Sequence, residues 1–100
     1  AEVRDPGVRR RTVTALARHY RRRREIPALL ELWDGEFQTA VLPRRLVLER
    51  LAMIWEWALR DPRQALMCTD QALGEARCLP PAVLQRLRLR RDRLVRKLSA

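Results

Sequence analysis

Arginine side chains are the groups in this sequence best able to do chemistry, and the chemistry they offer is anion binding. The chain has 21 Arg and one Lys against 12 Asp and Glu, for a formal net charge of +10. Guanidinium groups bind phosphates and carboxylates through paired hydrogen bonds. The excess charge lies at both ends, because residues 1–24 carry +7, residues 25–77 carry −3 and residues 78–100 carry +6. We therefore expect basic surfaces on both sides of a slightly acidic centre.

Two sets of basic residues have helical spacing. The first set, whose guanidinium groups could bind phosphates or an acidic peptide of a partner, is Arg11, Arg18, Arg21 and Arg22. The second set, which could contact phosphates along a nucleic acid, is Arg86, Arg90, Arg93 and Lys97. Each set also has a simpler interpretation. The run of arginines at 21–24 would complement the dipole at a helix C-terminus, and the second row is also expected of a solvent-exposed terminal helix.

Groups for catalysis or metal binding are scarce. The chain holds one His, one Ser, three Gly and no Asn. It therefore has no glycine-rich phosphate loop, and it lacks the side chains for a nucleophilic triad or a metal cluster. His19 has no second ligand at suitable spacing, so we interpret it as a surface residue. We expect no enzyme activity, no cofactor and no metal.

Residues of the expected third helix supply the other binding candidates. Trp57 and Met53 share a helix face with Glu49, and we expect Met53 and Trp57 to contact either a peptide or an adjacent domain. Too few aromatic residues are expected at the surface for a stacking platform, so any nucleic-acid contact would be electrostatic. The carboxylates of this helix are expected to pair locally: Glu49 with Arg45 or Arg50, and Glu56 with Arg60.

The sequence contains no membrane or secretion signal that we recognise. Uninterrupted apolar runs such as residues 46–48 are far shorter than the roughly 18 residues of a membrane span. The first residues have no apolar segment of the kind found in signal peptides. We therefore expect a cytoplasmic protein without a membrane partner, in which Cys68 and Cys78 are free thiols.

Apolar spacing and prolines predict the elements that must position these groups. Apolar residues recur at i, i+3, i+4 and i+7, and no stretch alternates with the period of a strand, which indicates an all-α chain. The expected helices cover about 6–23, 26–35, 43–59, 62–76 and 81–98. Asp5-Pro6 and Asp61-Pro62 are typical helix starts, and Gly35 is expected to end the second helix.

The third and fifth expected helices differ most in apolar content. Apolar residues of the third helix, Ala58 and Leu59 included, spread around its circumference, so we expect it to be the most buried element. Arginines interrupt the apolar stripe of the fifth helix, which we therefore expect to be a terminal cap.

An internal repeat relates the helices to one another. Small and aromatic residues match at offsets of 35 to 37: Leu16, Ala17, Tyr20, Ala28 and Gly35 match Leu51, Ala52, Trp55, Ala65 and Ala72. This pattern resembles the tetratricopeptide repeat over about residues 8–98. The resemblance implies one domain over residues 1–100, with two degenerate repeats of antiparallel helices, a C-terminal capping helix and a protein-binding groove on the inner helix faces. The pattern departs from the family at Arg88 and Arg91, which replace the small and aromatic residues.

A second resemblance concerns residues 51–61 and the small and basic residues that follow up to 91. This segment is similar to the C-terminal helical region of bacterial predicted exonucleases with an RNase H-like domain. The resemblance implies an accessory domain of a longer chain, without catalytic carboxylates of its own. Two functions stay open: a protein-interaction or scaffold module, and an accessory domain that binds nucleic acid electrostatically. Two repeats leave an end exposed, so self-association is a further expectation.

Overall fold

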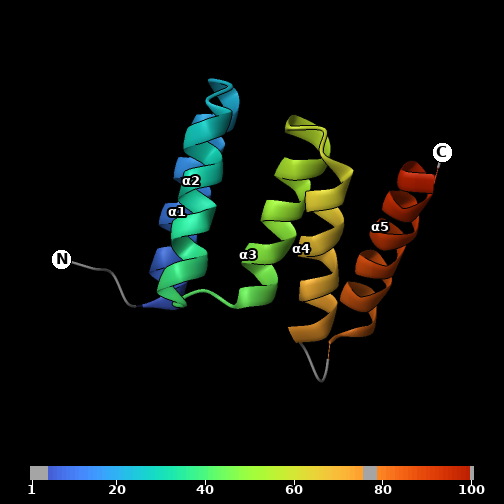
Figure 1. Ribbon diagram of the computed structural model, residues 1–100. Coiled ribbons are helices and arrows are strands. Elements are labelled where there is room, and N and C mark those ends of the chain that lie inside the picture. The colour runs from blue at the N-terminus through green and yellow to red at the C-terminus, as the bar shows by residue number, and fades with distance from the viewer. Residues whose placement is uncertain (1–4, 76–78, 100) are drawn as a thin grey trace.

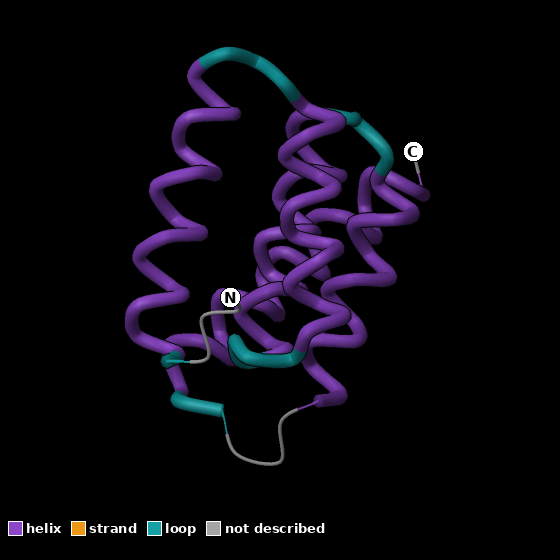
Figure 2. Tube along the Cα trace, turned by 90° about the vertical axis from the view of Figure 1, so that its left-hand side faces the viewer, coloured by secondary structure: helices purple, strands orange, loops and turns teal. Residues whose placement is uncertain are grey.

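The computed structural model describes residues 5–75 and 79–99, and every regular element in these ranges is a helix (Figures 1 and 2). The elements are α1 (Pro6–Arg22), α2 (Ile26–Thr39), α3 (Arg44–Met53), the π-helical turn η1 (Ile54–Ala58), α4 (Pro62–Glu75) and α5 (Pro81–Ser99). The predicted all-α class is confirmed. Cys78 and the expected end of the fourth helix at residue 76 lie outside the described residues.

Two helices begin where Asp-Pro pairs predict them. The carboxylate of Asp5 accepts a hydrogen bond from the backbone N–H of Val8 at 3.0 Å, and α1 begins at the following proline. Asp61 accepts in the same way from the N–H of Gln64 at 3.2 Å, at the start of α4. Both carboxylates satisfy a backbone donor that has no partner within the helix, so they fix where each helix starts.

The predicted end of α2 at Gly35 is wrong. The helix continues for one more turn, and Ala40 ends it in the left-handed conformation with φ 57° and an N–H that donates to the Glu36 carbonyl at 3.3 Å. The additional turn is stabilised by tertiary contacts, because the side chain of Glu36 is buried and Phe37 packs against the core. Gly35 itself is exposed, and no side chain beyond its immediate neighbours and no other helix comes within 4 Å of where a Cβ would stand.

Helix α3 lies at the centre of the core. Its Val47, Leu48 and Ala52 side chains are at most 1% exposed. Val47 belongs to a cluster shared with α1 and α2, which includes Trp33, whereas Leu48 packs with residues of α4 and α5. The prediction that this helix is the most deeply buried element is therefore confirmed for the residues of α3 itself.

The end of the third predicted helix differs from the prediction. Over η1 the hydrogen bonding changes to a wider turn, in which the N–H of Leu59 donates to the carbonyl of Ile54 at 3.0 Å. This i→i−5 turn holds more residues than an α-helical turn, so the residues after it leave the buried face. Ala58 and Leu59, expected to extend the apolar surface into the core, are exposed.

Each helix packs against its neighbours in the sequence, while alternate helices are separated. In residues 5–75 and 79–99, no Cα atom of α3 or η1 lies within 8 Å of a Cα atom in α1 or in α5. Helix α2 bridges α1 and α3, and helix α4 bridges α3 and α5. Figure 1 shows the resulting row, with α1 and α2 at one end and α5 at the other. Side chains must therefore span the distance from α3 to α1 or α5.

Replacement of Ala72 by Leu tests the close packing of α4. Ala72 is fully buried in the cluster with Leu48 and Leu87, so a larger side chain has no room. We expect Ala72→Leu to lower the free energy of unfolding by about 1–3 kcal/mol in urea denaturation. The matched control is Ala82→Leu at an exposed position of α5, which should leave that free energy nearly unchanged. Equal stability of the two variants would contradict the packing described.

Candidate functional site

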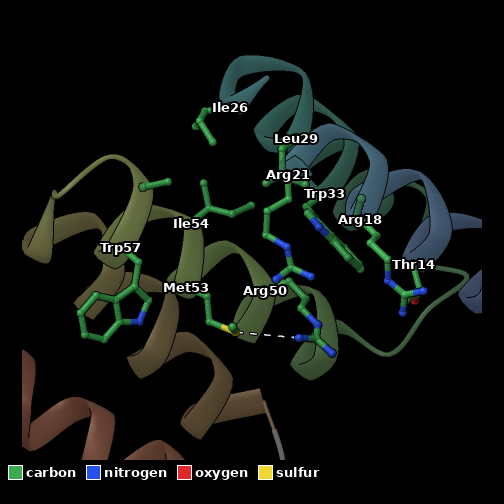
Figure 3. A pocket seen from close by; sticks show the side chains of 12 residues that line it. Thr14, Arg18, Arg21, Ile26, Leu29, Trp33, Arg50, Met53, Ile54 and Trp57 are labelled. Atoms are coloured by element: carbon green, nitrogen blue, oxygen red, sulfur yellow. Dashed lines mark hydrogen bonds between the residues drawn. The ribbon is translucent and has the colours of Figure 1, made fainter. Parts of the chain in front are cut away.

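A groove with a cavity of about 360 Å³ lies between α1 and α3 (Figure 3). We call it the α1–α3 groove. Its lining residues come from α1, α2, α3 and η1: Thr14, Ala17, Arg18, Arg21, Ile26, Leu29, Trp33, Arg50, Met53, Ile54, Trp57 and Ala58. A cavity of this size holds a few side chains of a partner rather than a whole helix or strand.

The floor of the α1–α3 groove is apolar and rigidly packed. Leu29, Trp33 and Ile54 line it and are each at most 6% exposed, because the same side chains form the core under α1 and α3. Trp57 lies at one end of the groove and is 59% exposed (Figure 3). A large indole at the surface beside an apolar floor is a common anchor for a protein partner.

The charged residues of the groove all have the same sign. Arg18 and Arg21 come from α1 and Arg50 from α3, and no carboxylate lines the cavity. None of the three forms an ion pair with an acidic residue in the described part of the chain. The Arg50 guanidinium makes only a weak contact with the Met53 sulfur, at 3.8 Å. Figure 3 shows Arg21 and Arg50 pointing into the space between the two helices.

The structure brings together four of the six residues predicted to bind a partner. Arg18, Arg21, Met53 and Trp57 line the α1–α3 groove, so residues more than 30 positions apart meet at one site. Arg11 lies outside the groove, in a shallow neighbouring hollow of about 480 Å³ that also contains Arg10 and Arg18. Arg22 lines neither the groove nor this hollow.

Arg50 lines the groove but was not among the binding residues predicted from the sequence, where it was expected only as a partner for Glu49. Arg50 precedes Met53 by three positions and Trp57 by seven, which is the spacing of one helix face. This spacing alone could have predicted that Arg50 lines the same groove as Met53 and Trp57. Glu49, which was predicted to share this face, does not line the groove and binds Arg86 of α5.

The side of α3 and η1 that faces α5 holds a buried acidic site, which binds the row of cations from α5. The Glu56 side chain is 1% exposed and accepts hydrogen bonds from Arg90 Nη1 at 3.0 Å, Arg93 Nε at 2.8 Å and Lys97 Nζ at 3.0 Å. The predicted pairing of Glu56 with Arg60 is wrong. The arginines that interrupt the apolar stripe of α5 thus include two that face the core and neutralise a buried charge.

Glu49 forms the second half of this site, two helical turns before Glu56. Arg86 donates to both of its carboxylate oxygens at 3.0 Å, and Arg45 donates from one turn away on α3 at 3.2 Å. The predicted Arg45 pair is confirmed. We call Glu49 and Glu56 with their basic partners the α3–α5 junction. All four basic residues predicted to contact phosphates therefore have carboxylate partners inside the protein.

A third buried carboxylate joins α1 to α2. Glu36 is 5% exposed, and both of its oxygens accept from Arg9, with distances of 2.7 Å to Nε and 2.8 Å to Nη2. This paired geometry is the strong form of an arginine–carboxylate contact. It anchors the last turn of α2 and thereby holds one wall of the α1–α3 groove in place.

The α3–α5 junction changes the titration of Glu56. Burial by itself raises the pKa of this carboxyl, but hydrogen bonds and positive charges from Arg93 and Lys97 outweigh burial and lower the pKa to about 2. Glu56 is therefore ionised at neutral pH and does not supply a proton. Its geometry fits a structural role in attaching α5, and it has no features of a general acid.

Trp57 connects the groove to the junction. Its ring lies 4.7 Å from Lys97 Nζ and 5.4 Å from Arg93 Cζ, within the range of cation–π contacts. The same side chain lines the α1–α3 groove. Two cations that neutralise Glu56 therefore also hold the indole at the end of the groove.

Other candidate groups offer little chemistry. Burial raises the pKa of the Cys68 thiol to about 11, with a further contribution from Asp34, so this free thiol is protonated at neutral pH. His19 is exposed beside Tyr20. Within the described ranges, no three His, Cys, Asp or Glu residues group as metal ligands, and no helix is long and apolar enough to cross a membrane.

No protein-family model, curated protein or solved structure matches the chain.

Removal of the Glu56 charge tests the α3–α5 junction. Glu56→Gln leaves three cations near a buried site without their carboxylate, and we expect the free energy of unfolding to fall by about 3 kcal/mol. The control is Glu75→Gln, which removes a half-exposed ion pair with Arg44 and should cost below about 1 kcal/mol. Urea denaturation of both variants checks this. Equal losses would show that the junction contributes no more than a surface ion pair.

The lowered pKa of Glu56 predicts loss of stability in acid. Because the folded chain lowers the pKa of this carboxyl to about 2, against 4.5 in the unfolded chain, its contribution is complete above pH 5 and disappears as the pH falls toward 2. The shift corresponds to about 3 kcal/mol. The free energy of unfolding, measured from pH 7 to pH 2, should therefore fall more steeply for the unmodified chain than for Glu56→Gln. Parallel curves would contradict the assignment.

Proposed function

We propose that this chain is a non-catalytic protein-interaction module of tetratricopeptide-like architecture, which binds a segment of a protein partner in the α1–α3 groove. The observation that carries the proposal is the composition of that groove. A buried apolar floor, an exposed Trp57 at one end and three arginines without carboxylate partners meet around one cavity. Such a combination suits recognition of a polypeptide, since it offers both apolar burial and directed charge.

Several features support the repeat architecture. Consecutive helices run in opposite directions in Figure 1, as two helical hairpins and a fifth helix require. Three small residues of the repeat pattern, Ala52, Ala65 and Ala72, are fully buried and allow neighbouring helices to approach closely. Gly35 departs from the pattern, because it is exposed in the middle of α2.

The partner segment can belong to another protein or to an adjacent domain of a longer chain. The resemblance of residues 51–91 to the helical region of RNase H-like exonucleases suggests a nuclease domain as such a neighbour. In that arrangement the module would be accessory to catalysis, and the α1–α3 groove would hold the neighbour in place.

Electrostatic binding of nucleic acid is the second candidate function. The shallow hollow on α1 favours it, since this surface presents Arg10, Arg11 and Arg18 with no acidic residue in its lining. The row on α5 gives it less support, because Arg86, Arg90, Arg93 and Lys97 already bind Glu49 and Glu56. Nucleic acid would therefore have to bind mainly through α1.

Selection of a phage-displayed random-peptide library on the purified chain tests the proposed function. We expect enriched peptides that lose at least tenfold in affinity with Trp57→Ala. The matched control is Met67→Ala, which removes an equally exposed apolar side chain, 57% exposed, from α4 outside the groove. Circular dichroism of both variants checks that they are folded. Failure to enrich any peptide, or equal binding by the Trp57→Ala variant, would overturn the proposal.

Titration with labelled single- and double-stranded oligonucleotides at two salt concentrations separates the second candidate. Binding through arginines to phosphates falls steeply with salt and ignores base sequence. Salt-dependent oligonucleotide binding whose affinity is unchanged by Trp57→Ala would favour nucleic-acid binding over peptide binding. Absence of binding at low salt would eliminate the second candidate.

A further inference from the structure

The arginines on the two sides of α3 differ in whether they have carboxylate partners. On the side toward α5, two buried carboxylates form ion pairs with four cations of that helix. On the side toward α1, three arginines surround a cavity that no carboxylate lines. At the α3–α5 junction the arginines therefore have carboxylate partners, whereas in the α1–α3 groove the arginines have none.

The repeat offset shows which groups the α1–α3 groove lacks. At the offset of 35 residues that matches Leu16 with Leu51, Glu49 and Glu56 correspond to Thr14 and Arg21. Both of these residues line the groove. Where α3 presents two acids to α5, α1 therefore presents a hydroxyl and a cation to α3, and the missing carboxylates have no substitute in the described residues of the lining.

This charge arrangement restricts what can cover the groove. An apolar segment that covered Trp33 and Ile54 would also remove the guanidinium groups of Arg21 and Arg50 from water without a counter-charge, which is costly. A ligand with carboxylates would pair with them through strong hydrogen bonds, as Arg93 does with Glu56. A bare phosphate backbone would satisfy the arginines but leave the apolar floor uncovered.

We propose that the α1–α3 groove binds the side chains on one face of an acidic amphipathic helix of a partner protein, with two carboxylates seven residues apart and an apolar residue between them. The inference rests on the proposed function and specifies its ligand. The spacing comes from Glu49 of α3 and Glu56 of η1, which are seven residues apart with Met53 between them in sequence. In a partner α-helix this spacing is about two turns, roughly 10.5 Å along the axis. The apolar residue would contact the floor near Trp57, and the carboxylates would bind Arg18, Arg21 and Arg50.

A defined peptide pair tests this inference. The probe is an acetylated, amidated 17-residue helix of Ala and Gln with Glu at positions 5 and 12 and Leu at position 9, and its counterpart has Gln at both acidic positions. We expect the Glu peptide to bind at least tenfold more tightly than the Gln peptide in fluorescence anisotropy, with the difference shrinking at high salt. The double variant Arg21→Gln/Arg50→Gln should remove that difference.

The control variant, Arg88→Gln/Arg96→Gln, lowers the net charge equally at exposed positions of α5 and should retain the preference for the Glu peptide. Equal binding of the two peptides, or no binding of the Glu peptide, overturns the inference. Trp57-dependent library peptides without acidic residues overturn it while leaving the proposed function intact. A library that yields no peptide overturns both. An oligonucleotide that displaces the Glu peptide also overturns the inference if its binding needs Arg21 and Arg50 but not Trp57. Such a result would favour nucleic acid as the ligand of the groove.

Discussion

The buried carboxylate of Glu56 is the interaction on which the C-terminal third of the structure depends. Helix α5 carries many like charges, and it touches α4 but not the backbone of α3 or η1. Arg90, Arg93 and Lys97 can turn toward the protein because one ionised group accepts hydrogen bonds from all three. Without that group the same cations would repel one another and require water. The charge balance of this junction therefore determines whether a strongly basic helix can pack at all.

The same dependence explains why net charge is a poor guide to binding in this chain. The two terminal segments have similar excess charge, yet most cations that face inward from α5 are neutralised, whereas Arg18 and Arg21 on α1 have no carboxylate partner in the described structure. The difference lies in what α3 presents to each neighbour. It presents Glu49 and Glu56 to α5, and Arg50 to α1. Which arginines keep a guanidinium without a carboxylate partner therefore depends on this pairing and not on the total of +10.

Local signals predicted the helices well and the ion pairs poorly. Asp-Pro starts and apolar spacing act within a few residues, so the sequence was sufficient to place α1 and α4. The end of α2 depends on burial of Glu36 against Arg9, 27 residues away, and no local pattern shows that contact. The same holds for Glu56, whose nearby Arg60 looked like its partner although residues of α5, 34 to 41 positions later, bind it. Groove residues on α1 and α3 were predictable from helix faces, while their lack of carboxylate partners required the tertiary structure.

The position of Trp57 links events at the two sides of α3. Its indole lines the α1–α3 groove and also contacts Lys97 and Arg93, which hold Glu56. A partner that moved this ring would change the surroundings of the cations behind it, and loosening of α5 would alter the end of the groove. Affinity at the groove and attachment of α5 are then thermodynamically coupled, and the coupling must be equal in both directions. Under the proposed function, the terminal helix would therefore influence recognition, although it contributes no residue to the cavity.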